Sequence, residues 1–310
     1  MKKFVILPDL TCDLSPELRE RFGLQEYISG YLHINDKSMR STLDWESISR
    51  EEFYKTLSNK HNQVSTAVAS PEEFYQAFRK YAEQGYDIIS MSISAAISGT
   101  YNVSLTAAER IRADFPDCRI HCVDSRRMSG SFGLLVMYAC ELRDSGRSFE
   151  ETVAWLEENK NRIHQMGPID DLTFVARRGK ISKGKAFMGN LVGVKPMGDS
   201  NADGYVTVLA KAKGIKKALD ATVKYCKRMA VGVENQYLLI SHSDREEYAL
   251  QLQEKLRQEI PCKEVFVSDV FPGCGSNIGP GMVCMYFLGE PITEDSTKEK
   301  EALTQALAEC

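Results

Sequence analysis

Short apolar runs and stretches of helical periodicity follow one another along the first half of this chain. The apolar runs lie at 4–7, 86–93 and 119–123, and each predicts a strand. One helical stretch opens with a serine and a proline at 70–71, and its aromatic residues recur on one face. Similar patterns predict helices that begin at Ser15, Ser49 and Ser148, one that ends near 112, and one over 132–142. Strands that alternate with helices favour a mostly parallel sheet with both faces covered.

The second half has a different pattern. Residues 170–175 and 192–196 are expected to be extended, the turn-rich cluster 198–204 follows, and 205–209 is strongly β-forming. This order predicts a hairpin, and hence an antiparallel or mixed sheet. Helices are predicted over 215–229 and 245–258, strands over 237–241, 264–267 and 282–288, a glycine-rich loop over 272–281, and an amphipathic helix or a frayed end after 290.

We therefore expect an α/β protein of two domains. The N-terminal domain spans 1–160 and has a mostly parallel sheet, and the C-terminal domain spans 161–310 and has a mixed sheet. The last strand, near 282–288, is a candidate to pack back on the first domain.

Composition excludes several classes of protein. The chain is 43% apolar and 26% charged, which is typical of a globular protein, and its net charge of −4 gives no reason to expect nucleic-acid or membrane binding. The N-terminal apolar run is too short for a signal peptide, and no stretch approaches the roughly 20 apolar residues of a membrane span. Nine scattered cysteines fit reduced thiols. We expect a cytoplasmic protein without a transmembrane segment.

The turn at 94–101 is the strongest candidate for a ligand site. It connects the strand at 86–93 to a helix, and it is rich in serine, threonine and glycine. Hydroxyls and free backbone N–H groups at a helix N-terminus suit a carboxylate or a phosphate, and in open α/β sheets ligands bind at this edge. An ordinary capped helix start has the same pattern, so both interpretations stay open at this point.

Other polar segments are each open to a plainer interpretation. The loop 9–13 carries two acids and a threonine that either bind a ligand or cap the turn. Thr66 either reaches a carboxylate or is structural, and Arg126 and Arg127 either meet an anion or are surface charge. The basic segment 177–185, with Arg177, Arg178 and Lys180, either docks an acidic partner or is a solvated loop.

No pattern for catalysis, for a metal or for a nucleotide cofactor is found. The segment 118–122 has two cysteines and a histidine on an expected strand, with no second pair at metal-binding spacing. The glycines of 273–281 do not follow the dinucleotide-binding pattern, and no phosphate-binding P-loop occurs. We therefore predict no catalytic residues, no metal and no cofactor.

Taken in chain order, these segments resemble the DegV family, whose members resemble the fatty-acid-binding subunit of bacterial fatty acid kinase. The matching motifs are 9–14, 66–70, 94–101, 123–125, 178–182, 195–196, 203–204, 211–213 and 279–281. Each motif is modest alone, but their order over nearly the whole chain is specific.

The resemblance implies the two-domain DegV-like (EDD) fold, in which an acyl chain is buried and its carboxylate is held between the domains. It implies a carrier of a long-chain fatty acid without catalytic activity of its own, whose bound carboxylate a separate kinase subunit phosphorylates. The carboxylate positions that it implies are Thr66, Ser94, Ala95, Lys213 and Asn277, and the positions that support the ligand loops are Ser98, Gly99, Thr100, Gly279 and Gly281.

Three of these positions depart from the family pattern. Ala95 stands where the family has a serine that contacts the carboxylate, and Asn277 stands where it has a histidine. Lys213 replaces an arginine, which keeps the charge but loses the bidentate fork. Either the carboxylate is held differently, or the ligand is not a simple fatty acid, or coupling to a kinase has been lost.

Two rival functions stay open. A related fold holds small molecules for phosphoryl transfer, and a protein that senses acyl chains for regulation would also bind them. The lining of the pocket discriminates, because a carrier needs an apolar pocket and an enzyme for small polar substrates needs a polar one.

Overall fold

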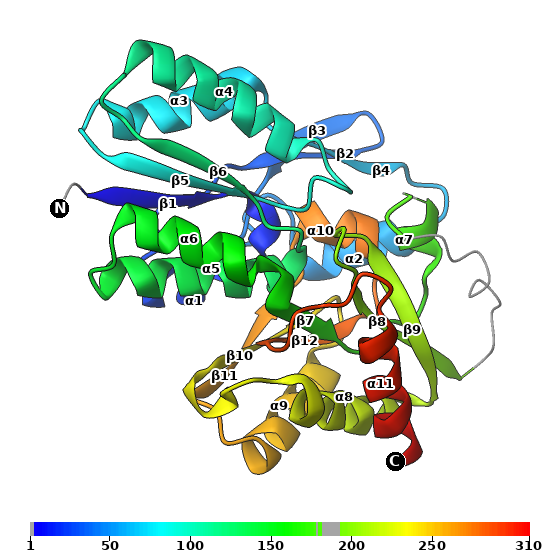
Figure 1. Ribbon diagram of the computed structural model, residues 1–310. Coiled ribbons are helices and arrows are strands. Elements are labelled where there is room, and N and C mark those ends of the chain that lie inside the picture. Colours follow the sequence, from blue (N-terminus) through cyan, green and yellow to red (C-terminus); the bar gives the residue numbers. More distant parts are fainter. Residues whose placement is uncertain (1–2, 178, 182–192) are drawn as a thin grey trace.

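The first half of the protein is built on a parallel three-stranded sheet. The computed structural model describes residues 3–177, 179–181 and 193–310 (Figure 1). The sheet has the order β1-β5-β6 and consists of β1 (Phe4–Pro8), β5 (Asp87–Ser92) and β6 (Ile120–Asp124). Every residue of β5 is buried, as expected for the central strand of a sheet with both faces covered.

Helices cover both faces of this sheet. One face packs against α3 (Pro71–Ala82) and α4 (Thr100–Asp114), and the other against α5 (Ser129–Asp144) and α6 (Phe149–Asn159). Helix α3 begins as its sequence predicts, because the Ser70 side chain accepts from the Glu73 N–H and Glu73 accepts from the Ser70 N–H.

The second half contains a mixed four-stranded sheet in the order β11-β10-β12-β7. Its strands are β7 (Ile163–Met166), β10 (Tyr237–His242), β11 (Glu264–Asp269) and β12 (Val283–Leu288). Strands β10 and β11 are parallel, whereas β12 is antiparallel to both β10 and β7. The helices of its outer side are α8 (Ile215–Met229), α9 (Glu246–Glu259) and α11 (Thr297–Ala308).

Helix α5 lies between the two sheets (Figure 1). It packs against β1 on one side and against β7, β10 and β12 on the other. Residues 129–140 of this helix are all buried, which agrees with a helix that is apolar around its whole circumference. One hydrophobic cluster therefore joins Ile6 and Met91 of the first sheet to Leu239 and Tyr286 of the second.

A small antiparallel sheet and a hairpin complete the architecture. The sheet is β3-β2-β4, from β2 (Gly30–Ile34), β3 (Lys37–Ser41) and β4 (Val64–Ala67), and the hairpin pairs β8 (Val194–Ser200) with β9 (Val206–Lys213). Shorter helices lie around them, namely η1 (Leu10–Cys12), α1 (Pro16–Arg21), α2 (Arg50–Ser58), η2 (Lys160–Arg162), α7 (Thr173–Arg177), η4 (Val233–Asn235) and α10 (Pro272–Ile278).

Most predicted elements are confirmed, including the parallel first sheet, the hairpin after 192, the mixed second sheet and the terminal helix. Two predictions are wrong. Part of 170–175 begins α7 instead of a strand, and the glycine-rich stretch 272–278 is the helix α10 instead of a loop. The sequence patterns also did not predict the β2–β3 pair. Strand β12, which covers most of the predicted strand 282–288, pairs within the second sheet and packs against α5. The domain boundary near 160 stays a prediction.

Candidate functional site

A cavity of about 450 Å³ lies where the two halves of the protein and the small antiparallel sheet meet. This volume falls in the usual range of small-molecule sites, roughly 300–1,000 Å³. Its lining comes from the ends of the parallel strands, from α10, from the hairpin and from the inner face of the second sheet.

The apolar wall follows the strand period of two. Met282, Cys284 and Tyr286 alternate along the β12 segment and point to the same face of the sheet. On the neighbouring β7 segment, Gln165 is the register partner of Tyr286, and Ile169 that of Met282. Cross-strand pairs of this kind form a continuous surface on one face of the sheet. This face is apolar except for Gln165.

The hairpin and α7 extend the apolar wall. Met197 of β8 and Val206 and Val208 of β9 line the cavity, as do Leu172 and Val175 beside them. Met197, Leu172 and Val175 are buried, whereas Val206 and Val208 are partly exposed. The surroundings are those that an apolar molecule needs in order to be removed from water.

The first half of the chain supplies hydroxyls and helix N–H groups to the cavity. Ser98, Gly99 and Thr100 line it where α4 begins, and the Ser98 and Thr100 hydroxyl oxygens lie 2.8 Å apart. The first N–H groups of a helix have no partners within the helix and favour an anion. Thr66 of β4 lines the opposite side, and its side chain is bonded to no other residue of the described part.

Asn277 and Lys180 also line the cavity. The amide Nδ2 of Asn277 donates to the Gly273 carbonyl oxygen at 3.3 Å and to the Ser276 hydroxyl oxygen at 3.2 Å, which leaves only its Oδ1, an acceptor, without a partner among the described residues. The Lys180 Nζ donates to the carbonyl oxygen of Ile97, next to the hydroxyl turn. Among the described residues of the lining, Lys180 is the only one with a cationic side chain.

Two buried carboxyl groups lie beside the inner part of the cavity. Asp9 lines it and accepts the Ile93 N–H at 2.9 Å as well as the Thr11 N–H and hydroxyl. Burial raises the pKa of Asp9. Asp13 is fully buried, accepts the Ser129 hydroxyl at 2.6 Å and the Phe271 N–H at 3.0 Å, and burial raises its pKa to about 8.

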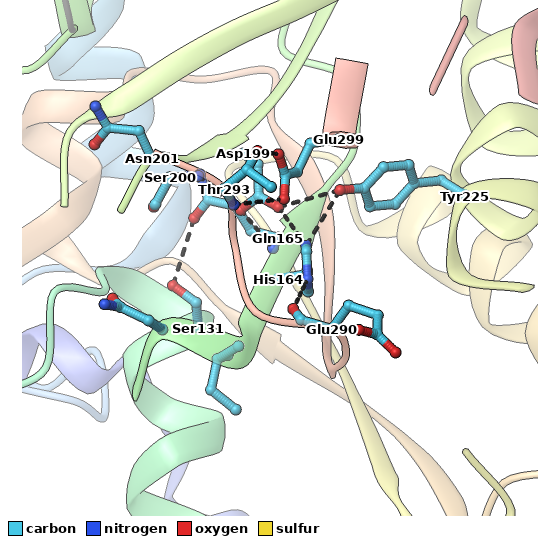
Figure 2. Close-up of polar contacts among 12 residues, drawn as sticks. Ser131, His164, Gln165, Asp199, Ser200, Asn201, Tyr225, Glu290, Thr293 and Glu299 are labelled. Atoms are coloured by element: carbon cyan, nitrogen blue, oxygen red, sulfur yellow. Dashed lines mark hydrogen bonds and ion pairs between the residues drawn. The ribbon is translucent and has the colours of Figure 1, made fainter. Parts of the chain in front are cut away.

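A polar network behind the wall fixes β7 to the hairpin (Figure 2). The His164 Nδ1 and Asp199 Oδ2 lie 2.8 Å apart, and Asp199 Oδ1 accepts the backbone N–H of Gln165 at 3.0 Å. The Tyr225 hydroxyl donates to the same carboxylate at 3.4 Å. Because His164 and Asp199 are almost fully buried, the network holds the two walls in one geometry.

Six of the predicted site residues meet at this cavity, namely Thr66, Ser98, Gly99, Thr100, Lys180 and Asn277. Ser94, Ala95, Lys213, Gly279 and Gly281 are not among the described residues of its lining. Lys213 is exposed at the end of β9. Arg178 lies outside the described residues, as does the side chain of Arg177.

Ser94 and Ala95 are turned toward a neighbouring loop. The Ser94 N–H donates to the Arg127 carbonyl oxygen at 2.9 Å, and the Ala95 N–H donates to Asp124 Oδ1 at 3.0 Å. Gly204 has a φ of 89° and lies so close to Ser94 that a Cβ would be 2.1 Å from its hydroxyl oxygen. These contacts come from residues distant in sequence, which is why the motif alone did not indicate the direction of Ser94.

Gly279 and Gly281 are constrained by packing. A Cβ at Gly279 would lie 2.3 Å from the Phe174 ring, and one at Gly281 would lie 2.5 Å from the Asp170 Cβ. Both residues have a positive φ. They therefore shape the segment that follows α10, behind the lining.

Gln165 and Ser129 are lining residues that the sequence patterns did not indicate. Gln165 belongs to a strand whose other residues gave no chemical motif, and Ser129 is the first residue of a helix with a positive φ of 51°. The described residues contain no group of three or more His, Cys, Asp or Glu side chains that could hold a metal ion. In the part of the chain that was searched, every helix is too short or too polar to cross a membrane.

Comparisons with known proteins agree with this architecture. A family model described as "Uncharacterised protein, DegV family" matches residues 3–290. A DegV domain-containing protein of Clostridium perfringens is 34% identical over 290 residues, which cover 94% of this chain and 99% of that relative.

Two solved structures resemble the whole fold. A DegV family protein from Thermus thermophilus, described as binding fatty acid, superposes with a TM-score of 0.83 at 26% identity, over 93% of this chain and 100% of that one. The fatty acid kinase B3 protein of Streptococcus pneumoniae, loaded with linoleic acid, superposes with a TM-score of 0.78 at 20% identity, also over 93% and 100%. On the family model and the Clostridium relative together, the chain belongs to the DegV family.

Proposed function

We propose that this protein binds a long-chain fatty acid, with the acyl chain against the strand walls and the carboxylate at the polar rim. The observation that carries the proposal is the composition of the cavity, in which apolar side chains of β8, β9 and β12 face hydroxyls, a helix start and one lysine. The solved fatty-acid-bound relatives support the same kind of ligand. A small polar substrate would leave the apolar walls unpaired, which argues against the phosphotransfer enzyme.

The acyl chain supplies most of the affinity in this proposal. Each buried methylene contributes about 0.8 kcal/mol, so a dozen methylenes exceed any single polar contact. The cost of ordering a flexible chain and of losing its translational freedom offsets part of that gain. The walls therefore set the affinity, and the rim sets the orientation.

Thr66, Ser98 and Thr100 are the proposed partners of the carboxylate, with Lys180 as its cation, whereas the Asn277 amide donates within its own segment and only lines the cavity. Each of these side chains lines the cavity, and the start of α4 adds the positive end of its dipole. The resemblance to the family implied the cationic role for Lys213, which is exposed and does not line the cavity. We assign that role to Lys180, and Ser94 and Ala95 keep an indirect role through the shape of the turn.

A carrier that presents its ligand to a kinase is the proposed biological role. The carboxylate lies at the rim, where Ala67 and Gly99 are exposed and Val68 is 40% exposed, so a partner can reach it. The chain itself supplies binding, and the partner supplies ATP and the phosphoryl transfer. All nine cysteines are free thiols, which supports a cytosolic location.

Native mass spectrometry of protein purified from its own host tests the proposal. A co-purified acid of 14 to 18 carbons is expected. After delipidation, myristic to stearic acids at about 100 times their dissociation constants should stabilise the fold by about 2.7 kcal/mol. Delipidated protein that melts at the same temperature with and without these acids would contradict fatty-acid binding.

Thr66→Ala tests the position of the carboxylate. Loss of a hydrogen bond to a charged group costs about 1.5–3 kcal/mol, so affinity should fall about tenfold or more without a change in chain-length preference. Ser65→Ala is the matched control, because Ser65 neighbours Thr66 on β4 and does not line the cavity. Unchanged affinity with a sharply lower melting temperature would show that Thr66 is structural.

A further inference from the structure

Gln165 places an unused hydrogen-bond donor inside the cavity. Its side chain is only 9% exposed, and it lines the cavity next to Tyr286. Its Oε1 accepts from the Ser131 hydroxyl at 3.4 Å (Figure 2). Its Nε2 donates to no residue in the part of the chain that the structure describes. This nitrogen is not one of the fully enclosed polar atoms that lack a partner, so it opens onto the cavity and a molecule bound there can reach it.

The surrounding contacts hold Gln165 in place. Its backbone N–H donates to Asp199, which His164 and Tyr225 hold in turn. Ser131 belongs to the first turn of α5, and its single hydroxyl proton points mainly to the Met128 carbonyl oxygen at 2.6 Å, so its contact with Gln165 Oε1 at 3.4 Å is the weaker one. The backbone of Gln165 is therefore fixed in the wall, so a ligand has to order little more than the amide itself.

The chemistry around this donor favours a neutral oxygen. An amide N–H pressed against methylenes loses its hydrogen bond to water and gains nothing in return. An anionic group is expected at the rim instead, because Lys180 is the only cation among the described lining residues and lies beside the hydroxyl turn. A hydroxyl or keto oxygen satisfies the donor without adding charge.

We propose that Gln165 forms a second polar subsite, and that the preferred ligand is a long-chain fatty acid with a hydroxyl or keto oxygen along its chain. This inference rests on the proposed fatty-acid binding and narrows the ligand class from fatty acids in general to fatty acids with an oxygen along the chain. The carboxylate contacts the rim, the chain oxygen accepts from Gln165 Nε2, and the methylenes on either side contact the apolar walls.

Calorimetric titration of delipidated protein with stearic, 10-hydroxystearic, 12-hydroxystearic and 12-oxostearic acids tests this inference. At least one oxygenated acid should bind about fivefold tighter than stearic acid or more, because it pairs a buried donor that stearic acid leaves unpaired. Gln165→Met keeps the length of the side chain and the backbone contact to Asp199. This variant should lose the preference and bind stearic acid at least as tightly as the wild type does.

Met197→Leu is the matched control, because Met197 also lines the cavity and is buried but carries no donor. It should shift the affinities for all four acids together and leave the preference intact. The subsite would be overturned if the wild type bound all four acids equally, or if the preference persisted in Gln165→Met. Either result would leave fatty-acid binding intact, and a water molecule in the cavity would then pair with the Gln165 amide. Binding of none of the acids would refute the proposed function and this inference with it.

Discussion

The two sides of the cavity are built in different ways. The second half of the chain contributes strand faces, on which apolar side chains such as Met282 and Cys284 alternate and pair across neighbouring strands. The first half contributes, beside apolar side chains such as Ile93 and Ile97, the polar ends of elements, where Ser98 and Thr100 open a helix and Thr66 lies near the end of a short edge strand. A strand face offers a continuous apolar surface with few polar groups, whereas element ends offer unpaired backbone groups.

This difference assigns separate tasks to the two sides. The strand walls act through area, so their effect on a ligand grows with the number of methylenes that they cover. The element ends act through single hydrogen bonds, so their effect is the same for every chain length. Substitutions on the two sides should therefore differ in whether the loss of affinity depends on the chain length of the fatty acid.

The largest effect is expected from filling the apolar side with Cys284→Phe. A ring that displaces about three methylenes removes about 2.4 kcal/mol of binding, or roughly fiftyfold in affinity for a C18 acid. Shorter acids should lose much less, because their chains end before the ring. Titration of a series from C12 to C18 measures both quantities.

Cys284→Ala is the control for this change, because it alters the same position and leaves the cavity open. It should bind C18 acids nearly as the wild type does. A uniform loss for all chain lengths in Cys284→Phe would show that the ring disturbs the rim, and the division between the two sides would then fail.

A smaller effect is expected at the rim from Lys180→Met. Removing the cation that we propose faces the carboxylate should lower affinity about tenfold, the lower end of the roughly 1.5–3 kcal/mol of a hydrogen bond to a charged group, because Lys180 is partly exposed. The loss should be equal for C12 and C18 acids. Lys213→Met is the matched variant, and the exposure of Lys213 predicts little change. A larger loss of affinity in Lys213→Met than in Lys180→Met would show that Lys213 is the cation that faces the carboxylate.

The buried carboxyl behind the rim predicts a dependence of stability on pH. In the unfolded chain Asp13 ionises near pH 4, while in the folded protein it stays protonated until about pH 8. The folded state therefore binds more protons between these values, and the free energy of unfolding falls as pH rises, by at most about 1.4 kcal/mol per pH unit.

Asp13→Asn removes this contribution while it keeps an acceptor for the Phe271 N–H. Chemical denaturation of both proteins from pH 5 to pH 8 measures the difference between their free energies of unfolding. The contributions of titrating groups that the two proteins share cancel in this difference. The variant should lose less stability than the wild type as pH rises. Parallel pH profiles would show that Asp13 ionises in the folded protein near its ordinary pKa.

The smallest effect is expected at the positions that depart from the family. Asn277→His replaces an amide whose hydrogens donate within the chain by an imidazole, which offers one N–H donor to the cavity, and it should change affinity only a few-fold. Ala95→Ser should change it less still, because residue 95 does not line the cavity. Competition with a fluorescent fatty acid measures both variants, and a larger effect of Ala95→Ser than of Asn277→His would show that the turn moves when the ligand binds.

The sequence predicted the rim better than it predicted the direction of its side chains. Hydroxyl-rich turns and strand ends correctly indicated 98–100 as residues of one edge, because capping and strand signals are local. The direction of Ser94 depends on Arg127 and on the turn at Gly204, which are distant along the chain. Gln165 gave no signal, because a single amide on a strand becomes distinctive only when the cavity beside it is known.

Helix α10 shows why a local signal failed. Its glycines predicted a loop, but they are present because neighbouring elements pack closely. A Cβ at Gly273 would lie 2.7 Å from Leu10 Cδ1, and one at Gly275 would lie 2.9 Å from Phe53 Cε1. Tertiary contact overrides the low helix propensity of glycine at both positions. Such contacts are formed between distant segments, so no sequence window contains them.

The position of α5 between two sheets has a consequence for how the protein is made. Residues up to Asp144 leave the ribosome before any strand of the second sheet, and the face of α5 that packs on β12 stays uncovered until Leu288 has been synthesised. At about 5–20 residues per second this interval lasts roughly seven to thirty seconds. During that time an apolar helix face is a target for chaperones, and a ribosome that stalls between the two halves would release a chain with half of its core exposed.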